Sequence, residues 1–285
     1  MAENRSTFTV GTMSGILGVS RSGFYDWLKR RASNRRLRDM ELLHEIRRIF
    51  RESHETYGCP RIHRELKRSG FNVSGKRVAR IMKMAGISPK KPVRRRIVTT
   101  DSNHDLPVSP DLLKRDFTAD GPNRKWVSDI TYIRTLAGWA YLCLVLDLFS
   151  RRIVGWSVRS HMKASLVCEA FNMAAASRRP VSGELIFHSD RGSQYASGEF
   201  RDVLEKHGVV QSMSRKGECL DNAVAESIIG TIKSELTEHR VYRDPEEARR
   251  DVLFYIEGFY NTKRLHSYLD YRSPDEFESL IREVA

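Results

Sequence analysis

Three strand-like segments follow one another between residues 126 and 160. The first, WVSDITYIRT, alternates between apolar and polar residues. After Gly138 comes YLCLVLDLFS, which is apolar on both faces, and then RIVGWSVRS. A strand that is apolar on both faces belongs in the interior of a sheet that is covered on both sides. These segments therefore predict an antiparallel meander, with a central strand, at the start of a covered sheet.

Helical and strand-like patterns alternate after the meander. The helical segments are KASLVCEAFNMAAASR and ASGEFRDVLEKHG, and the strand-like segments ELIFHSD and VVQSMS follow them in turn. This alternation predicts an α/β fold with a mixed five-stranded sheet and flanking crossover helices.

Two further helices are expected at the C-terminal end. DNAVAESIIGTIKSEL has Asp221 or Asn222 as its candidate N-cap. DPEEARRDVLFYIEGFY begins with Asp244 as a cap and Pro245 in the first turn. The second helix also carries an apolar stripe that we expect in the core: Val252, Tyr255, Ile256 and Phe259.

The basic residues are concentrated in the first hundred positions. Residues 1–100 contain 24 Lys and Arg against 8 Asp and Glu, whereas residues 101–285 contain 25 against 28. Such an asymmetry favours a module that binds a polyanion, with nucleic acid as the leading candidate. The alternative is a solvated basic surface that serves solubility.

No apolar run approaches the roughly 18 residues of a membrane helix, so no membrane partner is expected.

Helical patterns fill this basic region. MSGILGVSRSGFYDWLK, with Ser20 as a cap, predicts a short helix-turn-helix-like pair. LRDMELLHEIRRIFRE, RIHRELKRSG and GKRVARIMKMA, the last capped by Ser74, predict a helix-turn-helix domain. An ordinary helical bundle with a solvent-exposed basic face remains the alternative. The last helix is the candidate recognition helix, and its candidate DNA contacts are Lys76, Arg77, Arg80 and Lys83.

A segment that is poor in apolar residues and contains PKKPVRRR joins this region to the α/β body. It predicts an extended arm along DNA phosphates, or a simple tether. The candidate contacts are Lys90, Lys91, Arg94, Arg95 and Arg96. The expected division is 1–36 helix-turn-helix-like segment, 37–88 helix-turn-helix domain, 89–117 basic linker, 118–240 catalytic core and 241–285 helical extension of the core.

The four cysteines lie far apart, without a CxxC pair. This usage is typical of a reduced, cytoplasmic protein without a disulfide framework. His44, His54 and His63 lack the spacing of a zinc site.

Three acidic residues of the α/β body are candidates for metal-assisted phosphoryl transfer. Asp129 lies in the first strand, Asp190 ends the fourth strand and Glu226 lies in the helix that follows the sheet. Sixty residues lie between the first two acids and 35 between the last two. Carboxylate oxygens are the ligands that Mg²⁺ prefers, and two such ions about 3.5 to 4 Å apart can assist phosphoryl transfer. Lys233 follows Glu226 by seven residues, and therefore returns to nearly the same helix face, where it can meet a phosphate. Asn222, one turn before Glu226, shares that face.

Spacing alone leaves alternatives open, because 36 acids supply many pairs at any interval. Asp147, at the end of the second strand, is a rival ligand or a turn-side acid paired with a local arginine. His188 has either a supporting role beside the site or a packing role. Arg264 and His266 either contact DNA or pin the C-terminal segment.

The quoted segments resemble a known family over nearly the whole chain. WVSDITYIRT with LDLFSRRIVGW, FHSDRGSQYAS, CLDNAVAESIIGTIKSEL and YNTKRLHSYLDYRSPDEFE are similar, in this order, to the catalytic OrfB half of the transposases of the insertion-sequence "three" family. HETYGCPRI and the basic helices after it resemble the N-terminal region of the same proteins.

The resemblance implies an RNase H-like, retroviral-integrase-like core with a DDE triad at Asp129, Asp190 and Glu226, followed by the basic Lys233. It implies a bacterial DNA transposase, a polynucleotidyl transferase that uses two Mg²⁺ ions, with Mn²⁺ as a substitute. Its partners would be double-stranded DNA, both terminal inverted repeats and target, and further copies of the chain, at least a dimer. The family's upstream OrfA half is a further expected partner or fusion. A catalytically silent DNA-binding regulator or partner subunit, or a nuclease without strand transfer, is the alternative.

Overall fold

The computed structural model describes residues 1–29, 33–90 and 104–284. Two short helices, α1 (Val10–Leu17) and α2 (Arg21–Lys29), begin the chain. The Ser20 hydroxyl accepts the backbone N–H of Gly23 at 3.0 Å, which is the cap expected from the sequence.

The basic region folds into three helices, α3 (Asn34–Glu52), α4 (Cys59–Arg68) and α5 (Gly75–Met84). Ser74 caps α5 by accepting the N–H of Arg77. The three helices share an apolar core because their buried side chains recur at helical spacing. This core includes Leu42, Ile46, Ile49, Ile62, Leu66, Val78 and Ile81.

The α/β body is built on one five-stranded sheet with the order β3-β2-β1-β4-β5. Its strands are β1 (Lys125–Thr135), β2 (Gly138–Asp147), β3 (Ile153–Arg159), β4 (Ile186–Ser189) and β5 (Val210–Met213). The pairs β1–β2 and β2–β3 are antiparallel, and β1–β4 and β4–β5 are parallel. The predicted meander and mixed sheet are thus confirmed. The doubly apolar strand β2 is interior, as expected, but the middle position belongs to β1.

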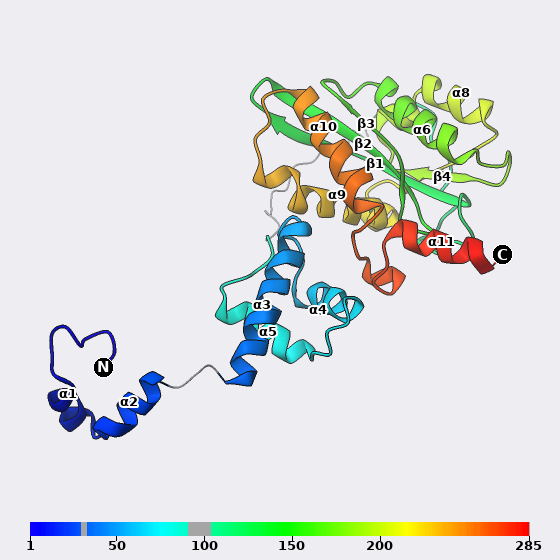
Figure 1. The fold of residues 1–285 in the computed structure, drawn as a ribbon. Coiled ribbons are helices and arrows are strands. Elements are labelled where there is room, and N and C mark those ends of the chain that lie inside the picture. The colour runs from blue at the N-terminus through cyan, green and yellow to red at the C-terminus, as the bar shows by residue number, and fades with distance from the viewer. Residues whose placement is uncertain (30–32, 91–103, 285) are drawn as a thin grey trace.

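Helices cover both faces of the sheet (Figure 1). One face is covered by α6 (Ala164–Arg178), α7 (Ser193–Ala196) and α8 (Gly198–Lys206), and the other by α9 (Ala223–Glu235) and α10 (Pro245–Tyr255). Residues of β2 alternate between the two apolar clusters: Leu142 and Leu144 face α9 and α10, whereas Cys143 and Val145 face α6. This alternation explains why the strand is apolar at every position.

The C-terminal part follows α10 as a π-helical turn (Ile256–Tyr260), a short 3₁₀ turn (Ser267–Leu269) and α11 (Pro274–Val284). Two further 3₁₀ turns, Cys219–Asn222 and Thr237–His239, flank α9. Asp244 caps α10 as predicted, and its apolar stripe is buried. No helix within the described ranges is long and apolar enough to cross a membrane.

Asn222, one of the two predicted candidates, occupies the N-cap position of α9, but it makes no side-chain cap hydrogen bond. Neither Asp221 nor Asn222 accepts a hydrogen bond from the first turn of the helix. Asp221 instead binds the guanidinium groups of Arg215 and Arg115, and the side-chain amide of Asn222 donates to the backbone carbonyl of Ser128 at 3.1 Å. Long-range partners have displaced the local cap, since charged donors offer an aspartate stronger hydrogen bonds than a backbone N–H.

Candidate active site

Asp129 and Asp190 lie at the same level of the sheet because β1 and β4 are parallel neighbours. In the register of this pair Val127 lies opposite His188, so each aspartate comes two residues after a paired position. Oδ1 of Asp129 accepts the N–H of Ile130 at 2.8 Å, and Oδ1 of Asp190 accepts the N–H of Gly192 at 3.0 Å. The parallel register thus brings Asp129, in the middle of β1, level with Asp190, which directly follows the carboxyl end of β4.

Helix α9 carries the third acid and the cation. Ala225, Ile228, Ile229 and Ile232 bury its apolar face against the sheet, while Glu226 is exposed. Lys233 is half-buried, and its Nζ lies 4.1 Å from the centre of the Tyr132 ring on β1. The hydrogen bond from Asn222 to Ser128 ties the start of α9 to β1, next to Asp129.

The charges of neighbouring acids act on both Asp129 and Glu226. Burial, together with the charges of Asp190 and Glu226, raises the pKa of Asp129 to about 8, although the Ile130 N–H and the charge of Lys233 act to lower it. Glu226 is exposed as a residue, but partial desolvation of its carboxyl group, followed by the charge of Asp190, raises its pKa. Burial lowers the pKa of Lys233, while Glu238 and Asp129 oppose this change. The structure therefore brings Asp129, Asp190 and Glu226 into one electrostatic neighbourhood, with Lys233 beside it.

The donor set suits a hard cation, because it consists of carboxylate oxygens that repel one another. Such repulsion is what a bound divalent ion would relieve. Within residues 1–29, 33–90 and 104–284, no three His, Cys, Asp or Glu side chains are already gathered around one point in a way that could hold a metal ion. Binding at this edge would therefore require the acids to move closer together.

The other candidates of the α/β body have structural partners. Asp147 is fully buried; it accepts the N–H groups of Asn123 and Phe149 and lies 3.3 Å from Arg178 of α6. Asp147 is therefore paired with an arginine, as one of the two alternatives from the sequence predicted, but this arginine comes from a distant helix and is not local. His188 is buried between the hydroxyl groups of Ser212 and Ser214.

Arg264 and His266 are buried and lie close to each other, with 3.5 Å between Nη1 and Nε2. Arg264 forms an ion pair with Glu235 at the end of α9. Both residues therefore pin the C-terminal segment in this structure, which is one of the two alternatives expected from the sequence.

The predicted DNA contacts of α5 differ in their surroundings. Lys76 and Lys83 are exposed, whereas Arg77 and Arg80 are partly covered and form ion pairs with Asp39 of α3. Lys90 lies near Glu55, at 4.0 Å. The remaining four, Lys91, Arg94, Arg95 and Arg96, fall outside the described residues.

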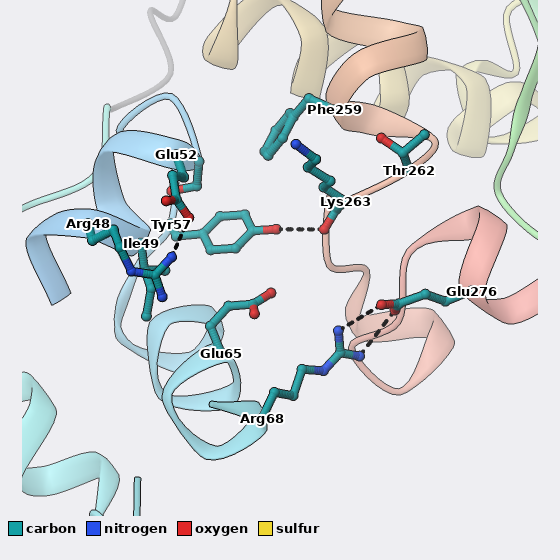
Figure 2. Close-up of a pocket in the computed structure, with 11 residues that line it drawn as sticks. Arg48, Ile49, Glu52, Tyr57, Glu65, Arg68, Phe259, Thr262, Lys263 and Glu276 are labelled. Atoms are coloured by element: carbon teal, nitrogen blue, oxygen red, sulfur yellow. Dashed lines mark hydrogen bonds and ion pairs between the residues drawn. The ribbon is translucent and has the colours of Figure 1, made fainter. Parts of the chain in front are cut away.

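A cavity of about 220 Å³ lies where α3 and α4 meet the segment that follows α10 (Figure 2). The Tyr57 hydroxyl donates to the carbonyl of Lys263 at 3.3 Å and accepts the N–H of Leu265 at 2.7 Å. Arg68 reaches both carboxylate oxygens of Glu276, at 3.1 and 3.2 Å. The basic helices are thus joined to the C-terminal segment by polar contacts. Sequence reasoning missed these contacts, since the partners are about two hundred residues apart.

Tyr132 is the residue beside the candidate site that sequence reasoning did not single out. Its ring centre lies 5.1 Å from that of Trp139 across the β1–β2 hairpin, and the face of the ring lies against the ammonium group of Lys233. In the sequence it is one aromatic residue of a strand, and nothing local indicates a lysine partner from α9.

Comparison with known proteins agrees with this architecture. Residues 37–96 match the model of an HTH-like domain, and residues 119–219 and 207–274 match models of the integrase core domain.

Two curated relatives align over nearly their full lengths. A 31 kDa protein of insertion element IS600 from Shigella sonnei is 41% identical over 273 residues, which cover 96% of this chain and 100% of that protein. The transposase InsF of insertion sequence IS3A from Escherichia coli K12 is 39% identical over 279 residues, which cover 97% of this chain and 96% of that protein. On this similarity and the matched domains, the chain belongs to the InsF-type transposases of the IS3 insertion-sequence family.

Proposed function

We propose that this transposase cleaves DNA strands at the ends of an insertion element and joins them to target DNA, with Asp129, Asp190 and Glu226 as its acidic triad. The observation that carries this proposal is the parallel register of β1 and β4, which sets Asp129 level with Asp190, together with the hydrogen bond from Asn222 to Ser128, which ties the start of α9 and so Glu226 to β1. Neighbouring carboxylates repel one another, so a group of them is typical of a site that binds a cation or transfers a phosphoryl group.

The acids would hold two Mg²⁺ ions, for which Mn²⁺ would substitute. When bound, these ions supply charge stabilisation for the attacking and leaving oxygens. Lys233, held over the Tyr132 ring, would donate hydrogen bonds to a phosphate of the DNA end. Asn222 would keep the start of α9, and so Glu226, next to Asp129 through its bond to Ser128.

The parts of the chain would divide this work. Residues 118–240 would form the catalytic core, and residues 241–285 its helical extension. Residues 37–88 would bind the terminal inverted repeats through α5, and the basic linker of residues 89–117 would follow phosphates. Residues 1–36 would join an upstream OrfA half. Two element ends must be processed together, so at least a dimer would act on the DNA.

The decisive experiment is the substitution Asp190→Asn, assayed on a radiolabelled terminal-repeat duplex with Mg²⁺. We expect strand cleavage to fall by at least about a thousandfold, because one carboxylate of the triad is lost, while end binding stays within about twofold. Asp202→Asn on α8 is the matched control: that side chain is exposed, and the same change of charge there should leave cleavage intact.

The products distinguish the alternatives. Joined product supports a transposase, cut product without joining indicates a nuclease, and binding without cutting indicates a regulator or a subunit. The assay is repeated with an OrfA-type partner to identify the last case. Cleavage by Asp190→Asn at the wild-type rate would remove Asp190 from the site.

A further inference from the structure

One carboxylate holds two arginines of the candidate recognition helix. Oδ1 of Asp39 lies 2.8 Å from Nε and 2.7 Å from Nη2 of Arg77, and Oδ2 lies 2.6 Å from Nη2 of Arg80. Arg77 and Arg80 are three residues apart on α5 and therefore share a face. Each carboxylate oxygen thus takes one guanidinium.

Asp39 is an unexpected residue at this surface. A groove between α3 and α5 is lined by Arg36, Arg47 and Arg80, and Asp39 is the one acid among its lining residues. An acid at a surface that meets DNA weakens the attraction for phosphates. Its presence here therefore needs a reason other than affinity.

Packing of the helices does not supply that reason. The apolar core already fixes α3 against α5 through Leu42, Ile46, Val78 and Ile81, all of which are buried. The three charged side chains are partly exposed, and exposed ion pairs contribute little to stability.

The effect on the arginines does supply a reason. A guanidinium has five N–H donors. Asp39 takes Nε of Arg77, whose Nη2 is buried, and Nη2 of Arg80, so Arg77 keeps Nη1 for DNA and Arg80 keeps Nε and Nη1, the latter held only by a weak contact with Met84. A side chain that is already oriented loses less entropy when it binds. An arginine that is oriented toward a base edge can bind guanine through two parallel hydrogen bonds, whereas an arginine on a phosphate contributes no sequence discrimination.

We infer that Asp39 is a specificity-determining positioning residue, which orients Arg77 and Arg80 toward base edges of the terminal repeat and suppresses their binding to arbitrary phosphates. This inference rests on the proposed DNA-binding role of α5. It predicts that the removal of the carboxylate lowers sequence discrimination while it raises affinity for unrelated DNA.

The test compares Asp39→Asn in the full chain with a matched control, Glu41→Gln. Glu41 is exposed on the same helix, so both variants remove one negative charge from α3. The dissociation constants are measured for a terminal-repeat duplex and for a shuffled duplex of equal length, at several salt concentrations. We expect Asp39→Asn to lower the ratio of specific to shuffled affinity about tenfold, mostly through tighter binding of the shuffled duplex.

Glu41→Gln should strengthen both affinities alike and keep the ratio. A second variant, Arg80→Lys, keeps the charge but loses the planar fork, and it should lower the ratio in the same way. Thermal unfolding of every variant checks that α3 and α5 stay together. The inference is overturned if Asp39→Asn has the wild-type ratio or matches Glu41→Gln.

Failure of the proposed DNA-binding role has a different signature. In that case Lys76→Gln and Lys83→Gln would leave both affinities unchanged, and the wild-type chain would not prefer the terminal repeat. This second result would overturn both proposals, whereas a changed affinity with an unchanged ratio overturns only the role of Asp39.

Discussion

The guanidinium of Arg264 meets the carboxylate of Glu235 through two hydrogen bonds, at 2.6 Å from Nη2 to Oε1 and at 2.8 Å from Nε to Oε2. Less than a tenth of either side chain is exposed, and the Tyr255 hydroxyl donates a third bond to the same carboxylate at 2.7 Å. Glu235 is the last residue of α9. The pair therefore ties the helix that carries Glu226 to the segment that follows α10.

Arg264→Met should destabilise the protein strongly, because it leaves the Glu235 carboxylate buried without its main partner. Loss of one member of a buried pair typically costs about 3 to 5 kcal/mol. Urea unfolding, followed by circular dichroism, measures the free energy. The double variant Arg264→Met with Glu235→Leu should recover part of the loss, since no buried charge then remains. A loss below about 1 kcal/mol in the single variant would contradict this account.

His266 should make the protein sensitive to mild acid. Burial, together with the nearby charges of Arg264, Arg61 and Arg151, holds the pKa of this imidazole well below its usual 6.5. Between pH 7 and 5 this imidazole therefore takes up a proton in the unfolded chain but stays neutral in the folded chain. The free energy of unfolding falls as the pH falls. The contribution of this residue is up to about 1.4 kcal/mol per pH unit below 6.5.

His266→Gln should flatten the loss of stability between pH 7 and 5, measured by urea unfolding at each pH. The control is His44→Gln, since His44 is exposed on α3. This variant should keep the wild-type slope. Equal slopes for His266→Gln and the wild type would show that this imidazole is not held neutral.

Lys233→Ala should lower the rate of strand cleavage about tenfold or more, because the proposed phosphate contact beside Asp129 is lost. The ammonium group lies over the Tyr132 ring, so the ring also contributes to its position. Tyr132→Phe keeps the ring face and should retain most of the activity, whereas Tyr132→Leu should lower it. Single-turnover cleavage of a terminal-repeat duplex measures these rates. Full activity of Lys233→Ala would remove Lys233 from the reaction.

The basic arm should make DNA binding depend on salt. Replacement of Arg94, Arg95 and Arg96 by glutamine should reduce the slope of log affinity against log salt by about 0.9 for each phosphate contact that is lost. Fluorescence anisotropy with a labelled duplex at several salt concentrations gives the slope. Since contacts to phosphate carry no sequence information, specific and shuffled duplexes should lose affinity alike. An unchanged slope would move the phosphate contacts to another part of the chain.

Much of the fold follows from local sequence. The alternation in β1, the doubly apolar run of β2 and the capping residues Ser74 and Asp244 depend on neighbours a few positions away, so a reading of the chain can find them. The excess of basic residues before position 100 likewise marks the helical region without any coordinates.

The environment of each acid did not follow from local sequence. Asp129 and Asp147 both lie on long strands of the same sheet, yet Asp147 lies 3.3 Å from Arg178 of α6, whereas the charges of Asp190 and Glu226 act on Asp129. Asp221 was one of two candidates for a helix cap, but it binds Arg115, more than a hundred residues away. Such partners depend on how strands and helices are arranged in space, and this arrangement cannot be predicted from the spacing of residues along the sequence.

By itself, the sequence determined the order and kind of the elements, because hydrophobic periodicity and capping act over one or two turns. Only the tertiary structure decided which charges meet. The parallel register of β1 with β4 set Asp129 level with Asp190, and the approach of α3 to α5 joined Asp39 to Arg77 and Arg80. The physical reason is that Coulomb interactions and hydrogen bonds depend on distance in space, whereas the local patterns depend on distance along the chain.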